Sequence, residues 1–368
     1  MGNATLALTL RAVRAIPVEV PLTYTLGTSA EVIRTAALLL VDLETEEGVT
    51  GHSYLFCFRH DVAPVVAAMV EAAARDIKGA RVAPLDLWAK LAARFKLIGV
   101  NGIVRMAMAG IDVAAWDALA IAAGVPLATL IGSAPRKIRA YNSCGLGLMA
   151  SPEAVADEAE KLLAGGFTGV KLRLGYPTLA ADLAAVRAVR RRIPDDVALM
   201  VDYNQALSLA EALRRGHALD DEGIYWLEEP IRHDDYAGNA RLTATLKTPI
   251  QIGENFSEVT AMAMALDAKA ADFVMPDLDR IGGVTGWQRA AGLAAAHRIE
   301  MSSHLFPEVS AHLLAATPTA HWLEYMDWAN PVLEEPMPIV DGFAVPSARP
   351  GNGLSWRRDA VEKYRIGP

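Results

Sequence analysis

The sequence of 368 residues predicts an α/β protein in which a (β/α) barrel follows a smaller α+β unit. From about residue 139 onward, short apolar segments alternate with amphipathic helical segments, which is typical of βαβ units and a parallel sheet. Eight such apolar segments in about 190 residues favour a barrel, with a doubly wound open sheet as the alternative. An apolar share of 52% supplies a large core and excludes a disordered chain.

The N-terminal unit is predicted to form strands first and helices second. Segments 12–22 and 35–44 are rich in β-branched and aliphatic residues, and a GVTGH turn leads into SYLFCF, so we expect an antiparallel meander. Three segments with apolar residues at helical spacing follow: Val62–Asp76, Pro84–Phe95 and Val104–Ile121.

The barrel strands are predicted in chain order, with a helix in each of the seven gaps between them. The predicted strands are Arg139–Ser143, Gly169–Leu174, Ala198–Tyr203, Ile224–Glu229, Ile250–Glu254, Phe273–Asp277, Glu300–His304 and His321–Met326. Ser151 is a typical N-cap for the first barrel helix, and Gly165 and Gly166 end it. After Trp328 the chain is rich in proline and glycine, and we expect this tail to pack on the meander.

These patterns predict three parts of the chain. They are a capping unit over residues 1–130, a barrel over residues 131–328 and a C-terminal segment over residues 329–368 that returns to the capping unit.

Charge and cysteine content restrict the expected partners and compartment. Lys and Arg number 35 against 43 Asp and Glu, a net charge of −8, so we do not expect a nucleic-acid partner. Cys57 and Cys144 are too few for a disulfide framework, which is typical of the cytoplasm. The uncharged run 118–135 is broken by Gly124 and Pro126, so we expect no membrane partner.

Carboxylates end three consecutive predicted strands. Asp202, Glu228 and Glu254 are spaced by 26 residues each, and the C-terminal strand ends of a barrel converge on one mouth. Three adjacent carboxylates repel one another unless a cation lies among them, and hard oxygen ligands favour Mg²⁺. The alternative is that each acid only caps the next helix. Asn204 shares the face of Asp202 and could orient a base or a ligand.

Further ionisable residues end the other strands. Lys171 and Arg173 point to the same face of one strand, where an anion such as a substrate carboxylate would neutralise them; a solvated strand edge is the alternative. His304 lies one βα unit after Asp277, so the two could form a pair in which histidine acts as general base. Glu324, on the last strand, could serve as a protonated acid if it is desolvated.

The segments VKLR, MVDYNQ, WLEEP, IGEN, MPDLDRIGGVTGW and MSSHLF together resemble the mandelate racemase subgroup of the enolase superfamily. The resemblance covers nearly the whole chain. It implies a modified (β/α)7β barrel with an α+β capping domain, a homo-oligomeric assembly and Mg²⁺ as cofactor. The implied metal ligands are Asp202, Glu228 and Glu254. The implied catalytic residues are Lys171 on the substrate carboxylate, the Asp277–His304 dyad as base, and Glu324 as hydrogen-bond donor to the developing enolate.

The chemistry that the resemblance implies is abstraction of the α-proton of a 2-hydroxycarboxylate through a metal-stabilised enediolate, as in a racemase. Two-base racemases of the family carry a second lysine where this chain has Arg173, and a guanidinium is a poor base. An acid-sugar dehydratase that uses His304 as its single base is therefore the alternative. A non-catalytic ligand-binding relative is a third possibility.

The resemblance also predicts which residues contact the distal group of the substrate. An apolar set of this kind suits an aryl group, although Glu31, Arg34, Arg59 and His60 nearby could serve sugar hydroxyls. The predicted contacts are Leu26, Ala30, Ile33, Phe56, Phe58, Leu305 and Met326.

Overall fold

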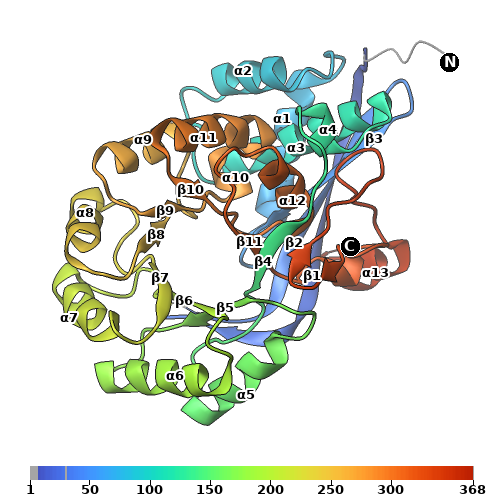
Figure 1. Ribbon diagram of the computed structural model, residues 1–368. Coiled ribbons are helices and arrows are strands. Elements are labelled where there is room, and N and C mark those ends of the chain that lie inside the picture. The colour runs from blue at the N-terminus through green and yellow to red at the C-terminus, as the bar shows by residue number, and fades with distance from the viewer. Residues whose placement is uncertain (1–6, 30, 368) are drawn as a thin grey trace.

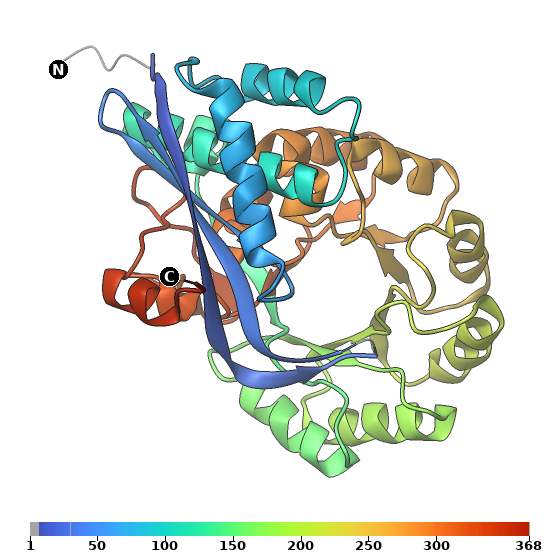
Figure 2. The ribbon, with the colours of Figure 1, turned by 180° about the vertical axis from the view of Figure 1, so that it is seen from behind.

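The computed structural model describes residues 7–29 and 31–367 and contains two β-sheets. The first sheet is an antiparallel meander in the order β1-β2-β3, as the sequence predicts. Its strands are β1 (Leu10–Gly27), β2 (Val32–Thr45) and β3 (Thr50–Phe56). The helices that follow are α1 (Ala63–Ile77), α2 (Pro84–Arg94), α3 (Ile103–Ala123) and α4 (Leu127–Leu130). In both views the long β1–β2 hairpin runs beside the barrel (Figures 1 and 2).

The second sheet is a parallel barrel of eight strands, extended by a short hairpin. The barrel strands are β4 (Ile138–Asn142), β5 (Gly169–Arg173), β6 (Ala198–Asp202), β7 (Ile224–Glu228), β8 (Ile250–Ile252), β9 (Phe273–Val274), β10 (Glu300–Met301) and β11 (Leu323–Tyr325). β11 pairs with β4, and a bridge between Met301 and Ala320 joins β10 to the segment before β11. The ring therefore closes, and the open-sheet alternative is wrong.

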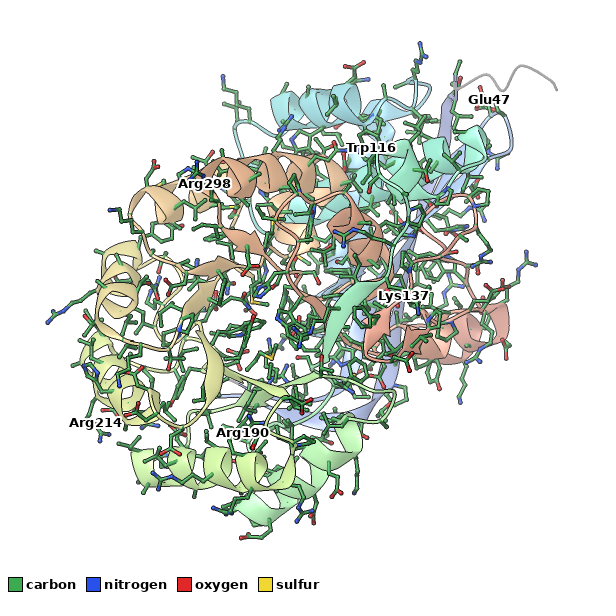
Figure 3. The ribbon with its side chains drawn as sticks, viewed as in Figure 1. Glu47, Trp116, Lys137, Arg190, Arg214 and Arg298 are labelled. Atoms are coloured by element: carbon green, nitrogen blue, oxygen red, sulfur yellow. The ribbon has the colours of Figure 1, made fainter. Side chains whose placement is uncertain are left out.

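Helices cover the outside of this ring in Figure 1. They are α5 (Pro152–Leu162), α6 (Leu179–Arg192), α7 (Leu209–Leu219), α8 (Tyr236–Thr245), α9 (Val259–Asp267), α10 (Leu278–Ile281), α11 (Gly283–His297) and α12 (Pro307–Ala315). The Ser151 side chain accepts a hydrogen bond from the Ala154 N–H and caps α5, as predicted. Figure 3 shows Arg190, Arg214 and Arg298 on this outer ring of helices.

The C-terminal segment contacts both sheets. It contains a short 3₁₀ helix, η1 (Asn330–Val332), the hairpin β12 (Ile339–Val340) and β13 (Phe343–Ala344), and α13 (Arg358–Tyr364). β13 pairs with β4 of the barrel. Beyond α13, the Ile366 N–H donates to the Pro17 carbonyl oxygen of β1 at 2.8 Å, so the tail reaches the meander as expected.

Helix α3 forms the interface between the meander and the barrel. Its Asp112 carboxylate accepts hydrogen bonds from the N–H and hydroxyl of Thr285 on α11. Among the described residues, α3 is the one helix long and apolar enough to cross a membrane, and 67% of its most apolar window is buried inside the protein. That burial is typical of a core helix.

Candidate active site

Three carboxylates from consecutive strands meet at the mouth of the barrel. Asp202 ends β6, Glu228 ends β7, and Glu254 lies two residues after β8. One oxygen of each carboxylate lies within 4.8 Å of the others, a spacing that one divalent cation can span. The Asn204 side chain donates to Asp202 Oδ2 at 2.9 Å and orients that carboxylate. These oxygen donors fit Mg²⁺.

Burial and mutual repulsion act on this triad. Burial raises the pKa of Glu228 to about 8, although the Lys171 ammonium opposes the shift. Burial likewise raises the pKa of Asp202, and the neighbouring Glu254 adds to that shift. Burial also opposes ionisation of Glu254, but the charge and hydrogen bond of His304, together with the charges of Arg280 and Lys171, outweigh burial and lower its pKa. A cation among the carboxylates would relieve their repulsion, so the electrostatics also fit a metal site.

The Lys171 ammonium lies among buried carboxylates. Its Nζ is 2.8 Å from Glu228 Oε1, 2.8 Å from Glu324 Oε1 and 3.4 Å from Asp202 Oδ2. Burial lowers the pKa of Lys171, but these carboxylates outweigh it and hold the pKa well above its ordinary value. Lys171 is therefore a fixed cation, suited to bind an anionic group.

The Arg173 guanidinium is hydrogen-bonded to the loop that follows β4. Its Nη1 donates to the carbonyl oxygens of Ser143 and Gly145 at 2.9 and 2.8 Å, and its Nη2 donates to Ser143 Oγ at 2.8 Å. Arg173 also lines the pocket described below. Both Nη atoms of Arg173 are thus bonded to backbone and to Ser143, while its buried Nε has no hydrogen-bond partner among the described residues. This geometry does not favour the expectation that Arg173 joins Lys171 on one anion, and the binding of an anion by Lys171 stays a prediction.

Asp277 and His304 form the predicted pair. His304 Nδ1 lies 2.7 Å from Asp277 Oδ2, and His304 Nε2 lies 3.1 Å from Glu254 Oε2. Asp277 is also the N-cap of α10, where it accepts the N–H groups of Asp279 and Arg280. Burial lowers the pKa of His304, but its carboxylate neighbours outweigh burial and raise it well above the ordinary value.

Glu324 accepts hydrogen bonds on both of its oxygens. Oε1 accepts from the Ser143 hydroxyl at 2.8 Å as well as from Lys171, and Oε2 accepts from the Leu305 N–H at 2.9 Å. Burial favours the protonated form, but Lys171 and His304 lower the pKa of Glu324 to about 2. In the site without substrate these cations favour the ionised form of Glu324, and its role as a protonated acid stays a prediction.

The sequence-based prediction missed several polar residues at this mouth, among them Ser143, Glu229, Asn255 and Arg280. The Asn255 amide donates to both oxygens of the buried Glu229, at 3.0 and 2.8 Å, and to Glu254 Oε1 at 3.1 Å. Arg280 Nη1 donates to Asn255 Oδ1 at 2.6 Å. The sequence held a signal for each of them. Ser143 ends the first predicted strand, Glu229 and Asn255 each directly follow a predicted metal ligand, and Arg280 lies one helical turn after Asp277.

A pocket of about 260 Å³ opens at this mouth between the barrel and the meander. Lys171, His304 and Glu324 line it. Six of the residues predicted for the distal group also line it: Leu26, Ile33, Phe56, Phe58, Leu305 and Met326. Ala30, the seventh, lies outside the described residues. Polar residues that were not predicted as substrate contacts complete the wall, among them Gln205, Asn255 and Arg280.

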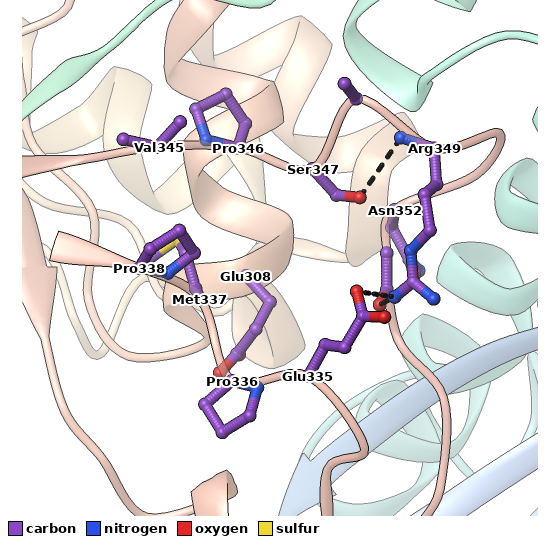
Figure 4. Close-up of a pocket in the computed structure, with 12 residues that line it drawn as sticks. Glu308, Glu335, Pro336, Met337, Pro338, Val345, Pro346, Ser347, Arg349 and Asn352 are labelled. Carbon is purple, nitrogen blue, oxygen red and sulfur yellow. Dashed lines mark hydrogen bonds and ion pairs between the residues drawn. The ribbon is translucent and has the colours of Figure 1, made fainter.

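A larger cavity of about 470 Å³ lies between the start of α12 and the C-terminal segment (Figure 4). Its wall includes Pro336, Met337, Pro338, Val345 and Pro346. Glu308 in this wall accepts a hydrogen bond from the Tyr54 hydroxyl at 2.7 Å, and Arg349 pairs with Glu335 at 3.4 Å. Within the described chain, the strand-end carboxylates and His304 lie outside this wall, so the smaller pocket is the candidate active site.

Two family models match the chain. The mandelate racemase/muconate lactonizing enzyme N-terminal domain matches residues 10–132, and the enolase C-terminal domain-like model matches residues 154–360. The chain belongs to the mandelate racemase/muconate lactonizing enzyme family. Relatives in this family are named as dehydratases, cycloisomerases and racemases, so the protein is an isomerase or a hydro-lyase of the enolase superfamily.

Similar proteins agree with this family assignment over nearly the full chain. L-talarate/galactarate dehydratase of Salmonella typhimurium is 32% identical over 325 residues, which is 88% of this chain and 81% of the relative. A solved enolase of an alpha proteobacterium, bal199, with bound magnesium is 43% identical, with a TM-score of 0.95 over 98% of this chain and 100% of that one. A Bradyrhizobium enolase complexed with magnesium and mandelic acid is 39% identical, with a TM-score of 0.94 over 98% and 99%. The predicted family and fold class are confirmed.

Proposed function

We propose that this protein is a Mg²⁺-dependent enzyme that removes the α-proton of a 2-hydroxycarboxylate, as mandelate racemase-type enzymes do. One observation carries the proposal. His304, held by Asp277, directs Nε2 toward the carboxylate triad and lies 3.1 Å from Glu254. A base and a site for a divalent cation thus share one mouth. The similar Bradyrhizobium enolase complexed with mandelic acid supports a substrate of this class.

The α-proton of a carboxylate is far less acidic than an imidazolium, so the negative charge that develops on the carboxylate must be stabilised. Asp202, Glu228 and Glu254 would hold Mg²⁺, which when bound supplies Lewis-acid stabilisation of that charge. The Lys171 ammonium, fixed by two carboxylates, donates to a substrate carboxylate oxygen. Its contribution grows as the charge develops.

Proton transfer is assigned to His304. In the neutral ring the Asp277 carboxylate keeps the proton on Nδ1, so Nε2 is the atom that accepts the α-proton. A cation bound by Glu254 would draw that carboxylate's charge away from Nε2 and favour the neutral ring. Glu324 is placed to donate a hydrogen bond to the developing enolate once it carries a proton. A substrate carboxylate that draws the charge of Lys171 away from Glu324 raises the pKa of that acid and favours this state.

The pocket wall supports an apolar distal group on the substrate. Phe56 packs against Phe58 and Trp328, with ring centroids 4.3 and 4.7 Å apart. Aromatic surfaces of this kind favour an aryl or similarly apolar substituent.

A specific observation favours a second candidate function, acid-sugar dehydration. Nη1 of Arg173 donates to loop carbonyls, and a guanidinium does not act as a base near neutral pH. Racemisation by two bases needs a proton carrier on each face of the substrate, whereas dehydration needs only one. His304 could take the α-proton and then protonate a departing β-hydroxyl, and Gln205, Asn255 and Arg280 offer polar contacts for other hydroxyls.

A substrate screen in D₂O tests the proposal and separates the candidates. Hydroxy acids and acid sugars are incubated with the Mg²⁺-loaded protein, and products are followed by polarimetry, a keto-acid assay and NMR of the α-position. Deuterium at the α-carbon supports the proposal, and a keto acid identifies the dehydratase. If hydroxy acids bind tightly but none exchanges its α-proton, the protein is a binding relative and the proposal is wrong.

A further inference from the structure

We propose that Arg173 is a positioning residue that clamps loop 143–145 to β5 and, through the Ser143 hydroxyl, decides which oxygen of Glu324 carries a proton. The clamp itself is a property of the folded chain. Its importance for turnover rests on the proposed function.

The guanidinium of Arg173 gathers three backbone carbonyls around one nitrogen. Nη1 donates to the carbonyl oxygens of Ser143 and Gly145 and, at 3.3 Å, to that of Lys171. Arg173 is 3% exposed, so water does not replace these bonds if they are lost. The Arg173 backbone N–H also donates to the Leu146 carbonyl at 2.9 Å. Arg173 therefore contacts the loop at its start, its end and the residue after it, beside the bonds that Tyr325 and Glu158 make to the N–H groups of Ser143 and Leu146.

The guanidinium also sets the direction of the Ser143 hydroxyl. Arg173 Nη2 lies 2.8 Å from Ser143 Oγ, and Ser143 Oγ lies 2.8 Å from Glu324 Oε1. A guanidinium can only donate, so Ser143 Oγ must accept from Arg173 and give its own proton to Glu324. A lysine at this position would supply a point charge in place of the planar fork that reaches the carbonyls and the hydroxyl together.

This direction has a consequence for Glu324. Oε1 accepts from both Ser143 and Lys171, so a proton on that oxygen would meet two donors. Oε2 accepts one hydrogen bond, from the Leu305 N–H, and a hydroxyl oxygen can still accept it, so the arrangement favours the carboxyl proton on Oε2, the oxygen that lies 3.9 Å from His304 Nε2. Arg173 thus acts through Ser143 to direct the proton of Glu324 toward His304. It does so without touching the substrate's reacting atoms.

The chain supplies its own reporter for the clamp. Cys144 lies inside the loop and is 3% exposed, and Cys57 is the only other cysteine in the sequence. In a Cys57→Ala background, the rate at which an aromatic disulfide reagent labels Cys144 in the native protein measures how often the loop opens. The assay needs neither metal nor substrate, so its failure is distinct from a failure of the proposed function.

The expected results separate the clamp from the hydroxyl link. In the Arg173→Met variant the reagent should label Cys144 at least tenfold faster than in the parent protein. The Ser143→Ala variant keeps the hydrogen bonds from Arg173 to the backbone carbonyls, so the rate of Cys144 labelling should stay within twofold of the parent rate. Its rate of α-proton exchange on an identified substrate should fall at least tenfold, with little change in KM. Arg105→Met is the matched control: Arg105 is also a buried arginine, paired with Glu258 at 3.0 Å, and its loss should leave Cys144 protected.

Labelling of Arg173→Met at the parental rate overturns the proposal, and so does equal acceleration in Arg105→Met. If Arg173→Met does not fold, Arg173→Lys is measured in the same way, because it keeps the charge but lacks the fork. Hydrogen exchange of peptide 143–149 in that variant should be faster than in the parent. A folded Lys variant with parental labelling and exchange also contradicts the clamp.

Discussion

Nδ1 of His304 lies 2.7 Å from Oδ2 of Asp277, and the other oxygen of that carboxylate caps the start of α10. The carboxylate cannot rotate away from the ring without losing the helix cap. The histidine tautomer and the direction of Nε2 are therefore fixed by a backbone element as well as by a side chain.

Asp277→Asn should lower kcat for α-proton exchange by about 10²- to 10⁴-fold with little change in KM, because an amide no longer stabilises the imidazolium that forms on His304. The amide oxygen can still cap α10, so the fold should survive. The measurement is the rate of deuterium entry at the substrate α-carbon. Replacing the exposed Asp267 with Asn is the control, and an equal loss there would point to a general effect.

Glu228→Gln should weaken Mg²⁺ binding by at least about tenfold, since one of three anionic ligands is lost. Without metal the same change should leave the protein as stable or more stable, because burial and repulsion oppose ionisation of Glu228 and raise its pKa to about 8. Titration calorimetry and the rise in Tm on adding Mg²⁺ measure these effects. Glu335→Gln, at an exposed acid, should behave like the parent; an unaltered Mg²⁺ affinity in Glu228→Gln would show that the triad is not the site.

Deuterium exchange should be confined to one enantiomer of a chiral 2-hydroxycarboxylate. The reason is that His304 is the one base assigned to the site. Arg173 Nη1 is bound to loop carbonyls, and a guanidinium does not serve as a second base. Chiral chromatography of substrate recovered from D₂O checks this. Comparable exchange of both enantiomers by the native protein would mean that a second proton carrier exists and would refute the single-base assignment.

Asp112 should make the free energy of unfolding depend on pH. Burial raises its pKa from 3.8 to about 7, although hydrogen bonds from Thr285 oppose the shift. The folded state holds this proton more tightly than the unfolded state, so the contribution is full below about pH 4 and falls as pH rises to about 7. The loss is at most about 4 kcal/mol. The free energy of unfolding is measured by urea unfolding at each pH for the parent and for Asp112→Asn, and the difference between the two profiles isolates the contribution of Asp112. Parallel profiles would contradict the assignment.

The sequence predicted the architecture because βα units have a repeating length and composition. All eight barrel strands lie within or beside the predicted segments, but several are shorter. The segment predicted to run from Ile250 to Glu254 ends as a strand at Ile252, because Gly253 adopts a φ of +141° that turns the chain. Glu254 therefore approaches the mouth from a turn, not from a strand.

The site could be predicted only as far as strand order determines proximity. The triad and the Asp277–His304 pair follow from consecutive strands that end at one mouth. The partners of Arg173 depend on the rotamer of a long side chain and on the path of loop 143–145, which no spacing rule specifies. The ionisation of Glu324 depends on the summed charges around it. Burial alone predicts a raised pKa, whereas Lys171 and His304 lower the pKa.

The pocket joins two stretches of chain that are far apart in sequence. Leu26, Ile33, Phe56 and Phe58 form its outer wall from within the first 60 residues, whereas the ionisable groups at its base lie between Lys171 and Glu324. Mutations in the N-terminal stretch can therefore reshape the space for the substrate while the proton-transfer groups keep their positions. Over evolutionary time a gene exchange near residue 130 would replace this N-terminal part of the wall, while Leu305, Met326 and the proton-transfer groups stay unchanged.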